Sequence, residues 1–283
     1  MKVMADKCKT NAFEAVIAWF RAAIYVLLVI LHVPIIFLIP KSRFSVWYMR
    51  FFMWSTGLPV GIRVRTHGKL TKKRPLLCIC NHISVFELFS VPIGYGCSFV
   101  GKIDIASYPL VGWIAKKFGV VFVDRRPSHA IEAIDAMSKQ MHSASYPVVI
   151  FPEGTTTNGA YVREFKSAMF NMVEEIPSLT VQPLVITYKT RRGKCVNDQV
   201  LANDYAYFDN AKQTQGPKCE VERSAFGQIY HVAKLGGITV DIYALDPVPL
   251  GGMDRKEIAK KLHEIVSNKY MELKDKEIKR DRK

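Results

Sequence analysis

The sequence of 283 residues lacks the signatures of several common enzyme classes. It has no G-x-G-x-x-G fingerprint after a strand and no P-loop, so the usual nucleotide-binding folds are not indicated. The G-x-S-x-G elbow of serine hydrolases and the H-E-x-x-H motif of zinc proteases are also missing. Its six cysteines form no C-x-x-C pair. A disulfide framework and a zinc site are therefore not expected, and a reducing compartment is the simplest inference.

Acidic residues are scarce relative to basic ones: 25 Asp and Glu stand against 40 Lys and Arg, a net charge of +15. Such an excess indicates a polyanionic partner, either nucleic acid, an anionic membrane surface or a phosphorylated substrate. Only the charge suggests nucleic acid, and no zinc-finger or RNA-binding signature supports it, so we expect no such partner. The basic run KDKEIKRDRK ends the chain, and residues 271–283 are expected to be a solvated tail that can touch anionic lipid.

One long apolar run is present, near the N-terminus. Residues 22–39 contain no formally charged side chain and are interrupted only by His32 and Pro34. This length just suffices for a membrane-spanning helix. A cleaved signal peptide fits poorly, because the run is too long and residues 40–43 are not a small-residue cleavage site. A buried core helix is less expected, since soluble domains rarely place such a run at a terminus.

Residues 44–62 form a second stretch, rich in aromatic side chains and broken by Arg50. This composition is typical of segments at the membrane–water interface. We therefore predict that residues 1–60 are a membrane anchor, either a single span or a two-helix hairpin in one leaflet. Basic residues stand at both ends of the anchor, so the positive-inside rule does not give its orientation: Arg21, Lys41, Arg43 and Arg50.

Residues 61–270 alternate short β-rich runs with helical ones. Strands are expected at residues 76–80, 97–101, 120–123, 148–151, 180–187 and 238–244. Helices are expected at residues 85–92, 109–118, 129–143, 166–175 and 255–270. This alternation predicts an α/β domain, a layered β-sheet flanked by helices. The polar stretch at residues 190–237 predicts an insertion or a long loop.

The apolar run at residues 76–80 ends in N-H-I-S-V-F-E, residues 81–87. Ser84 and Glu87 match the S-x-x-E capping box of a helix start, which accounts for both residues without any chemistry. The capping box does not account for His82 at the end of a strand. Because a histidine oriented by a carboxylate is a common general base, His82 and Glu87 are also candidates for catalysis.

Two further apolar runs end in residues capable of chemistry. G-V-V-F-V-D-R-R, residues 119–126, places Arg125 at a strand end, either as a solvated charge or as a guanidinium that can grip phosphate. In F-P-E-G-T-T-T-N-G, residues 151–159, Gly154 permits a tight turn and the threonines offer groups that can hold an anion. A plain β-turn is the alternative, but it does not need Glu153. Ligands of open α/β sheets bind at strand ends, so we expect these segments to form one site.

With V-Q-P-L-V, residues 181–185, these motifs closely resemble those of the glycerolipid acyltransferases, in particular the 1-acyl-sn-glycerol-3-phosphate acyltransferases. That family carries N-H-x-x-x-x-D, G-x-x-F-x-D-R, F-P-E-G-T and a V-P-x-x strand. Residues 102–119 also resemble its K…P-x-x-G…G segment. The resemblance covers roughly residues 60–190. The sequence departs from the family pattern at Glu87, where the family usually has aspartate.

The resemblance implies transfer of an acyl group from acyl-CoA or acyl-carrier protein to the 2-hydroxyl of 1-acylglycerol-3-phosphate, giving phosphatidic acid without cofactor or metal. His82 would take the hydroxyl proton and Glu87 would orient the imidazole. The lipid acceptor implies a membrane location with the active site facing the cytoplasm, at the inner membrane in a bacterium. The substrate-binding residues implied are Asn81, Lys102, Arg125, Glu153, Gly154 and Thr155, with Arg125 gripping the phosphate.

Two other functions stay open from the sequence. The acceptor can be another lysophospholipid, such as lysophosphatidylcholine or lysophosphatidylethanolamine, or it can be an ornithine-lipid precursor. Residues 155–158 do not distinguish between these acceptors. The chain can also be a catalytically degenerate lipid-binding membrane protein, an alternative that only Glu87 favours.

Overall fold

The computed structural model describes residues 12–40, 42–123, 146–176 and 178–281, together with residues 135, 138, 139 and 141. The described residues form a seven-stranded sheet with the order β1-β7-β6-β2-β5-β3-β4. The predicted α/β architecture is confirmed, although the first strand was not predicted. The strands are β1 (Ile62–His67), β2 (Leu76–Cys80), β3 (Ser98–Lys102), β4 (Val121–Val123), β5 (Val148–Ile150), β6 (Thr180–Thr190) and β7 (Ile238–Ala244).

The directions of the strands bring the predicted site segments together. β2 is parallel to both β5 and β6, and every residue of β2 is buried, as expected for a central strand of a covered sheet. β6 is antiparallel to β7, which in turn is parallel to β1. The C-terminal ends of β2, β5 and β6 therefore lie at the same end of the sheet as the starts of β7 and β1.

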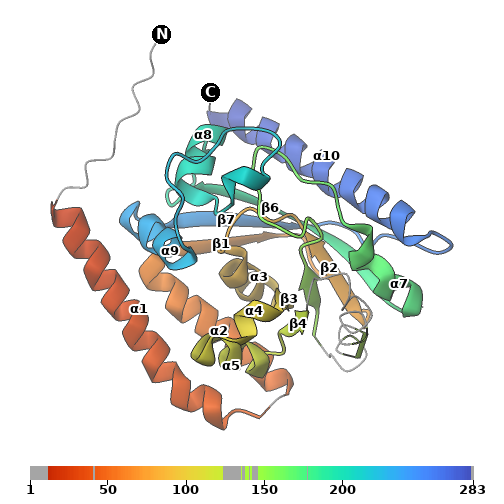
Figure 1. The fold of residues 1–283 in the computed structure, drawn as a ribbon, viewed down its shortest axis with the longest axis horizontal. Coiled ribbons are helices and arrows are strands. Elements are labelled where there is room, and N and C mark those ends of the chain that lie inside the picture. The colour runs from red at the N-terminus through yellow and green to blue at the C-terminus, as the bar shows by residue number, and fades with distance from the viewer. Residues whose placement is uncertain are drawn as a thin grey trace.

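Helices cover both faces of this sheet (Figure 1). α3 (Glu87–Tyr95) packs against β1 and β7, while α10 (Arg255–Asp281) crosses β6 on the opposite face. The sequence predicted that α10 ends at residue 270, but the helix continues for eleven residues. This continuation is packed: Leu273 is buried, and the Lys274 ammonium contacts Asp198 Oδ1 at 2.5 Å. Shorter helices are α4 (Ile103–Ala106), α5 (Pro109–Lys117), η2 (Ser167–Phe170) and α7 (Asn171–Glu175).

The stretch at residues 190–237 is more ordered than the sequence predicted. It contains α8 (Asp198–Val200), η3 (Leu201–Tyr205), η4 (Asn210–Lys212) and α9 (Ala225–Lys234). The Ser224 side chain caps α9 by accepting a hydrogen bond from the Gly227 N–H. Helix α9 was not predicted from the sequence. It is short and buries only part of its surface, so its apolar pattern does not stand out in a polar stretch.

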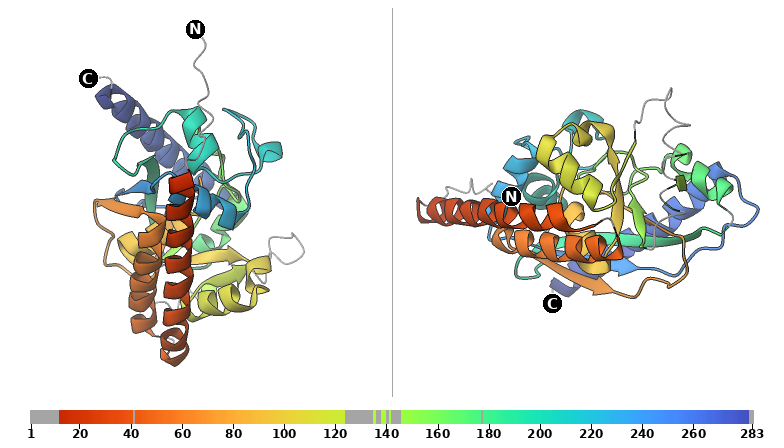
Figure 2. Two further views of the ribbon diagram at one scale, coloured as in Figure 1. Left: turned by 90° about the vertical axis from the view of Figure 1, so that its left-hand side faces the viewer. Right: turned by 90° about the horizontal axis from the view of Figure 1, so that it is seen from below.

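The N-terminal residues form two helices that lie side by side, α1 (Ala12–Leu38) and α2 (Arg43–Val60) (Figure 2). His32, the polar interruption of the apolar run, faces α2: its Nδ1 lies 2.5 Å from the Tyr48 hydroxyl and its Nε2 2.8 Å from the Ser55 hydroxyl. Buried side chains of α1 and α2, including Met49, pack with Ile114 of α5 and with Phe118, which follows α5, and form a separate small core. The two helices are therefore packed onto the body of the protein.

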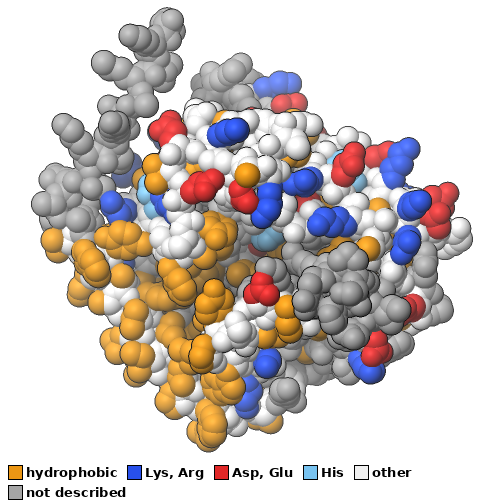
Figure 3. All heavy atoms as spheres, in the orientation of Figure 1, with side chains coloured by type: hydrophobic (Ala, Val, Ile, Leu, Met, Phe, Trp, Pro, Cys, Tyr) orange, Lys and Arg blue, Asp and Glu red, His pale blue; other side chains and the backbone are white. Residues whose placement is uncertain are grey.

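The outer face of this helix pair is strongly apolar, as the orange surface in Figure 3 shows. Within α1, Val16–Leu38 is apolar and long enough to cross a membrane, and 11% of its most apolar window is buried by the rest of the protein. Exposed apolar side chains in this region include Val16, Trp19, Phe20, Ile30, Leu31, Phe37 and Leu38 on α1, Phe44, Trp47 and Trp54 on α2, and Tyr108, Leu110 and Val111 near α5.

Candidate active site

The loop after β2 is fastened to the neighbouring strand by Asn81. The buried side-chain amide of Asn81 donates to the Ile186 carbonyl at 3.0 Å and accepts from the Ile186 N–H at 2.8 Å. The resemblance to the glycerolipid acyltransferases implied a substrate-binding role for Asn81. The structure uses both ends of this side chain inside the protein, so Asn81 fixes the place where β2 ends and the loop begins.

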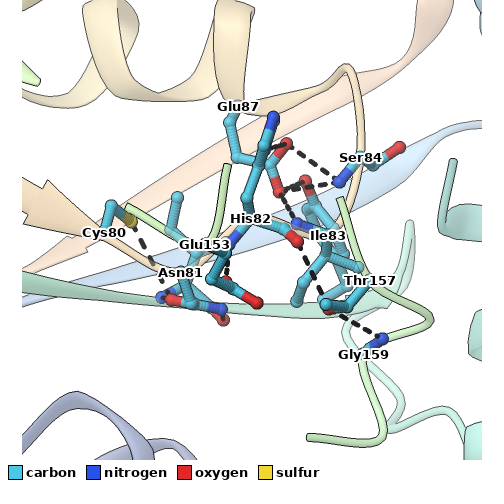
Figure 4. A network of polar contacts seen from close by, with 11 residues as sticks. Cys80, Asn81, His82, Ile83, Ser84, Glu87, Glu153, Thr157 and Gly159 are labelled. Atoms are coloured by element: carbon cyan, nitrogen blue, oxygen red, sulfur yellow. Dashed lines mark hydrogen bonds and ion pairs between the residues drawn. The ribbon is translucent and has the colours of Figure 1, made fainter. Parts of the chain in front are cut away.

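His82 follows Asn81 and faces a buried carboxylate (Figure 4). His82 Nδ1 lies 3.4 Å from Glu87 Oε2, with 21% of the His82 side chain and none of the Glu87 side chain exposed. Nδ1 has no hydrogen-bond partner in the described part of the chain, so the pair is in electrostatic contact without hydrogen-bond geometry. The imidazole also stacks on Phe151, with ring centroids 4.3 Å apart. Nδ1 thus faces the carboxylate, and Nε2 is left to exchange a proton with a ligand.

Glu87 is held by the loop that carries His82. Its carboxylate accepts hydrogen bonds from the Ile83 N–H at 2.9 Å and the Ser84 N–H at 3.0 Å. Half of the predicted capping box is therefore present. The other half is wrong, because α3 begins at Glu87 itself and the Ser84 hydroxyl has no partner among the described residues. The positive end of α3 further favours a carboxylate at this position.

Tyr188 on β6 is a member of the site that the sequence did not reveal. Its hydroxyl donates to Glu87 Oε1 at 2.7 Å. Burial, followed by the charge of Glu87, raises the pKa of Tyr188 well above its usual value, so the phenol remains a hydrogen-bond donor. The only signal was a tyrosine among the aliphatic residues of a buried strand, which is not specific enough to assign a role.

Glu153 ties the end of β5 to the histidine loop. It is fully buried; one carboxylate oxygen accepts from the His82 N–H at 2.6 Å and the other from the Arg163 N–H at 2.8 Å. Burial raises the pKa of Glu153 to about 8, against the opposing effect of these two hydrogen bonds. Glu153 was expected to bind substrate. In the structure both of its oxygens position the protein backbone next to His82.

The turn after Glu153 is tight and is covered by a lysine. Gly154 adopts a φ of +72°, and its N–H donates to the Phe151 carbonyl at 3.0 Å. A Cβ at Gly154 would come within 2.7 Å of Lys166 Nζ, so the turn requires glycine and the ammonium lies directly over it. The sequence analysis missed Lys166 because it follows the motif only after a long connection. Thr155 is partly exposed beside this turn.

The residues after Thr155 serve the loop structure. The Thr157 N–H donates to the His82 carbonyl at 2.9 Å, giving the histidine loop a second backbone anchor. The buried Asn158 side chain donates to the carbonyls of Gln215 and Pro217 at 2.7 and 3.0 Å. These bonds connect the site to the segment between β6 and β7.

Two predicted phosphate-binding residues are not placed in detail. Lys102 ends β3, which is parallel to β5, so its backbone lies at the same end of the sheet as His82. Arg125 and most of the predicted helix at residues 129–143 lie outside the described residues. Within the described residues, no three His, Cys, Asp or Glu side chains are grouped to hold a metal ion.

Comparison with known proteins identifies relatives of this chain. Residues 61–187 match the acyltransferase family model. The chain is 31% identical over 190 residues to the lyso-ornithine lipid O-acyltransferase of Rhizobium meliloti, covering 62% of this chain and 65% of that one. It is 25% identical to the Pseudomonas aeruginosa protein of the same name, covering 80% and 78%. The 1-acyl-sn-glycerol-3-phosphate acyltransferase of Neisseria meningitidis is 30% identical, covering 49% and 53%.

The fold has a counterpart among solved structures. The 1-acyl-sn-glycerophosphate acyltransferase PlsC of Thermotoga maritima superposes with a TM-score of 0.61, covering 93% of this chain and 96% of that one at 19% identity. At this identity the superposition supports the fold alone. The family match spans the sheet from β1 through β6 and includes the His82 loop and the Glu153 turn. Residues 61–187 are therefore an acyltransferase-family domain, and the relatives of the chain are named lyso-ornithine lipid and 1-acyl-sn-glycerol-3-phosphate acyltransferases.

Proposed function

We propose that this chain moves a fatty acyl group from a thioester, acyl-CoA or acyl-carrier protein, to the 2-hydroxyl of 1-acylglycerol-3-phosphate. The product would be phosphatidic acid. The observation that carries this proposal is His82 at a strand end, with Nδ1 3.4 Å from the buried Glu87 carboxylate. A carboxylate in this position favours the imidazolium that forms when a histidine removes a hydroxyl proton.

The reaction needs no protein nucleophile. Nε2 of His82 takes the proton of the acceptor hydroxyl while the hydroxyl oxygen forms a bond to the thioester carbonyl carbon. The carbon–sulfur bond then breaks, and the thiolate leaves with the proton held by His82. Glu87 stabilises the positive imidazolium between these two steps, and no cofactor or metal ion is invoked.

Several groups are available for the acceptor headgroup. Lys166 holds its ammonium over the Gly154 turn, and Thr155 is partly exposed beside it. Lys102 at the end of β3 and Arg125 are the further cations that the sequence implied. Their common chemistry is the binding of a phosphate by ammonium and guanidinium groups.

A lyso-ornithine lipid is the second candidate acceptor. It is favoured because two relatives that bear this name align with 62% and 80% of the chain. The chemistry at His82 is the same for both acceptors, since each presents a hydroxyl to the thioester. The two candidates differ in the headgroup, where ornithine replaces the glycerol phosphate.

The proposal includes membrane association through the outer face of α1 and α2. This face exposes aromatic and aliphatic side chains over a segment long enough to enter the hydrocarbon core. The thioester is a cytosolic compound, so the active site would face the cytoplasm. In a bacterium this corresponds to the inner membrane.

The test is reconstitution of the full chain in phospholipid vesicles with a panel of lysolipids and acyl donors. Products are identified by mass, and thiol release is followed in parallel. Phosphatidic acid as the preferred product supports the first candidate, and acylated ornithine lipid supports the second. Failure to acylate any lysolipid would leave the degenerate lipid-binding protein as the remaining interpretation.

A further inference from the structure

A group of basic side chains gathers at one end of the sheet, around a tight turn that follows β6. The Thr190 N–H donates to the Lys194 carbonyl at 2.9 Å, and the Gly193 N–H donates to the Thr190 carbonyl at 2.8 Å. Gly193 adopts the φ of +85° that this turn requires. The group, named here the arginine cluster, combines residues of α1, β1 and this turn: Arg21, Arg63, Arg65, Arg191, Arg192 and Lys194.

Strand pairing brings β1 and the turn together. The Arg65 guanidinium lies 3.5 Å from the position that a Cβ on Gly193 would occupy. Arg63 pairs in register with Thr239 of β7, and the Thr239 hydroxyl donates to the Arg191 carbonyl at 3.2 Å. Residues far apart in the sequence thus present their positive charges side by side.

Arg21 joins α1 to the same cluster. Its guanidinium donates to the Ala233 carbonyl at 2.6 Å, at the C-terminal end of α9. Burial, and then the charges of Arg63 and Arg21, lower the pKa of Arg191, so both of these guanidinium groups lie close enough to repel the charge of Arg191. All three remain charged at neutral pH, because guanidinium is too basic to lose its proton.

Among the described residues, no carboxylate balances these charges. In the part of the chain that the structure describes, Arg21, Arg63 and Arg191 form no ion pair. Asp241 stands opposite Arg65 in the sheet, but its two oxygens contact Lys189 at 2.6 Å and His67 at 3.0 Å. The arginine cluster is therefore open to an external anion.

The cluster is distinct from the candidate active site. Cys80, at the end of β2, pairs with Leu184, whereas β6 continues to Thr190 before the turn begins. The active site itself extends along β6 to Tyr188, whose hydroxyl donates to Glu87, two residues before β6 ends. Arg63 and Arg65 lie on β1, which is three strands from β2 in the sheet, or roughly 14 Å at about 4.8 Å per strand. The cluster and His82 are therefore separated across the sheet.

The neighbouring surface indicates which anion fits. Trp19 and Phe20 directly precede Arg21 on α1, and their side chains are 70% and 68% exposed. They stand at the N-terminal end of the apolar face that continues toward Leu38. Exposed aromatic side chains beside basic ones are typical of the level at which lipid headgroups lie.

We infer that the arginine cluster binds the phosphate headgroup of an anionic membrane phospholipid and so fixes the tilt of the enzyme on the bilayer. This inference rests on the proposed membrane association, but it is independent of the acceptor that the active site uses. Guanidinium groups suit this role because they hold phosphate oxygens in a bidentate geometry.

The test is flotation of the full chain with vesicles of phosphatidylcholine alone or with increasing fractions of phosphatidylglycerol. The double variant Arg63→Gln/Arg191→Gln is compared with Lys72→Gln/Lys73→Gln, which removes the same charge from the exposed loop between β1 and β2. On wild type, phosphatidylglycerol should strengthen binding. Each arginine charge removed should reduce the increase in vesicle affinity caused by phosphatidylglycerol roughly five-fold, whereas the lysine variant should lose much less of this increase.

Equal losses in the two variants would overturn the inference, because they would reflect net charge alone. Binding of wild type that does not depend on phosphatidylglycerol would overturn it as well. If wild type fails to float with any vesicle, the proposed membrane association falls together with the inference. A second experiment adds inorganic pyrophosphate or CoA to the flotation assay. If either compound binds the arginine cluster at low concentration and abolishes the dependence of vesicle binding on phosphatidylglycerol, the cluster is a site for a soluble phosphate and not for a lipid.

Discussion

Replacing Glu87 by glutamine isolates the charge that the account places beside His82. Glutamine has nearly the same size and keeps one carbonyl oxygen, which can still accept from the Ser84 N–H. The negative charge 3.4 Å from His82 Nδ1 is lost. The substitution therefore changes the electrostatics of the imidazole far more than the packing of the loop.

The magnitude follows from this distance. A charge pair separated by 3.4 Å interacts by about 5 kcal/mol at an effective dielectric constant of about 20. This is an upper limit for His82, because part of its side chain is exposed and water screens the pair. Allowing for the screening, we expect Glu87→Gln to lower kcat by about 10²–10³-fold.

The assay is acyl transfer in reconstituted vesicles, with kcat and KM determined separately for lysolipid and thioester. KM should change little, because Glu87 is fully buried and is not accessible to a substrate. Glu87→Asp is the matched variant: it keeps the charge and withdraws it by roughly one bond length of about 1.5 Å. It should retain activity within about tenfold of wild type.

One result would refute this reasoning: a folded Glu87→Gln protein whose kcat lies within about threefold of wild type. It would show that the carboxylate only holds the loop through the Ile83 and Ser84 amides. Equal, severe loss in Glu87→Gln and Glu87→Asp would point to the same structural role, so thermal unfolding of both variants is the control.

Two further predictions concern the turn after β5. The Glu153 pKa of about 8 lies above its ordinary value of 4.5, so the folded state should lose stability relative to Glu153→Gln as the pH rises through this interval. Melting temperatures of both proteins across this range test it, and a constant difference would contradict the buried, raised pKa. Lys166→Met should raise KM for a phosphate-bearing acceptor about three- to tenfold while leaving KM for the thioester unchanged. Lys72→Met is the control for charge, and equal changes in both KM values would exclude the headgroup role.

The buried strands could be predicted from the sequence with small errors at their ends. β2 and β7 were predicted with the bounds that the structure shows, because β2 is an uninterrupted apolar run between Pro75 and Asn81 and β7 is rich in β-branched residues and follows two glycines. β1 was not predicted: it alternates arginine with apolar or small residues and lies at the edge of the sheet, so it carries little apolar signal. A buried central strand is easier to predict from the sequence than an edge strand, because burial requires an apolar composition.

The chemistry of the site could be predicted in part. His82 and Glu87 are close in sequence, so a loop and a helix start suffice to bring them together. The links from Glu153 to His82 and from Tyr188 to Glu87 span separate strands. These contacts depend on the order of the strands in the sheet, and no local pattern contains that information.

The roles of individual polar residues were the least predictable feature. Asn81 and Glu153 carry groups that suit a ligand, yet the fold uses them to satisfy backbone N–H and C=O groups at strand ends. A buried backbone group must be paired, and the nearest polar side chain often does this. From sequence alone, a side chain that binds substrate and one that holds the loop look the same.

The most direct test of the account compares wild type with His82→Ala in vesicles that contain lysophosphatidic acid, lyso-ornithine lipid and acyl-CoA. Mass spectrometry identifies the acylated product, and release of CoA thiol gives the rate. The account predicts that wild type acylates one of these lipids and that His82→Ala is at least about 10²-fold slower with an unchanged melting temperature. Turnover by His82→Ala at the wild-type rate would contradict it.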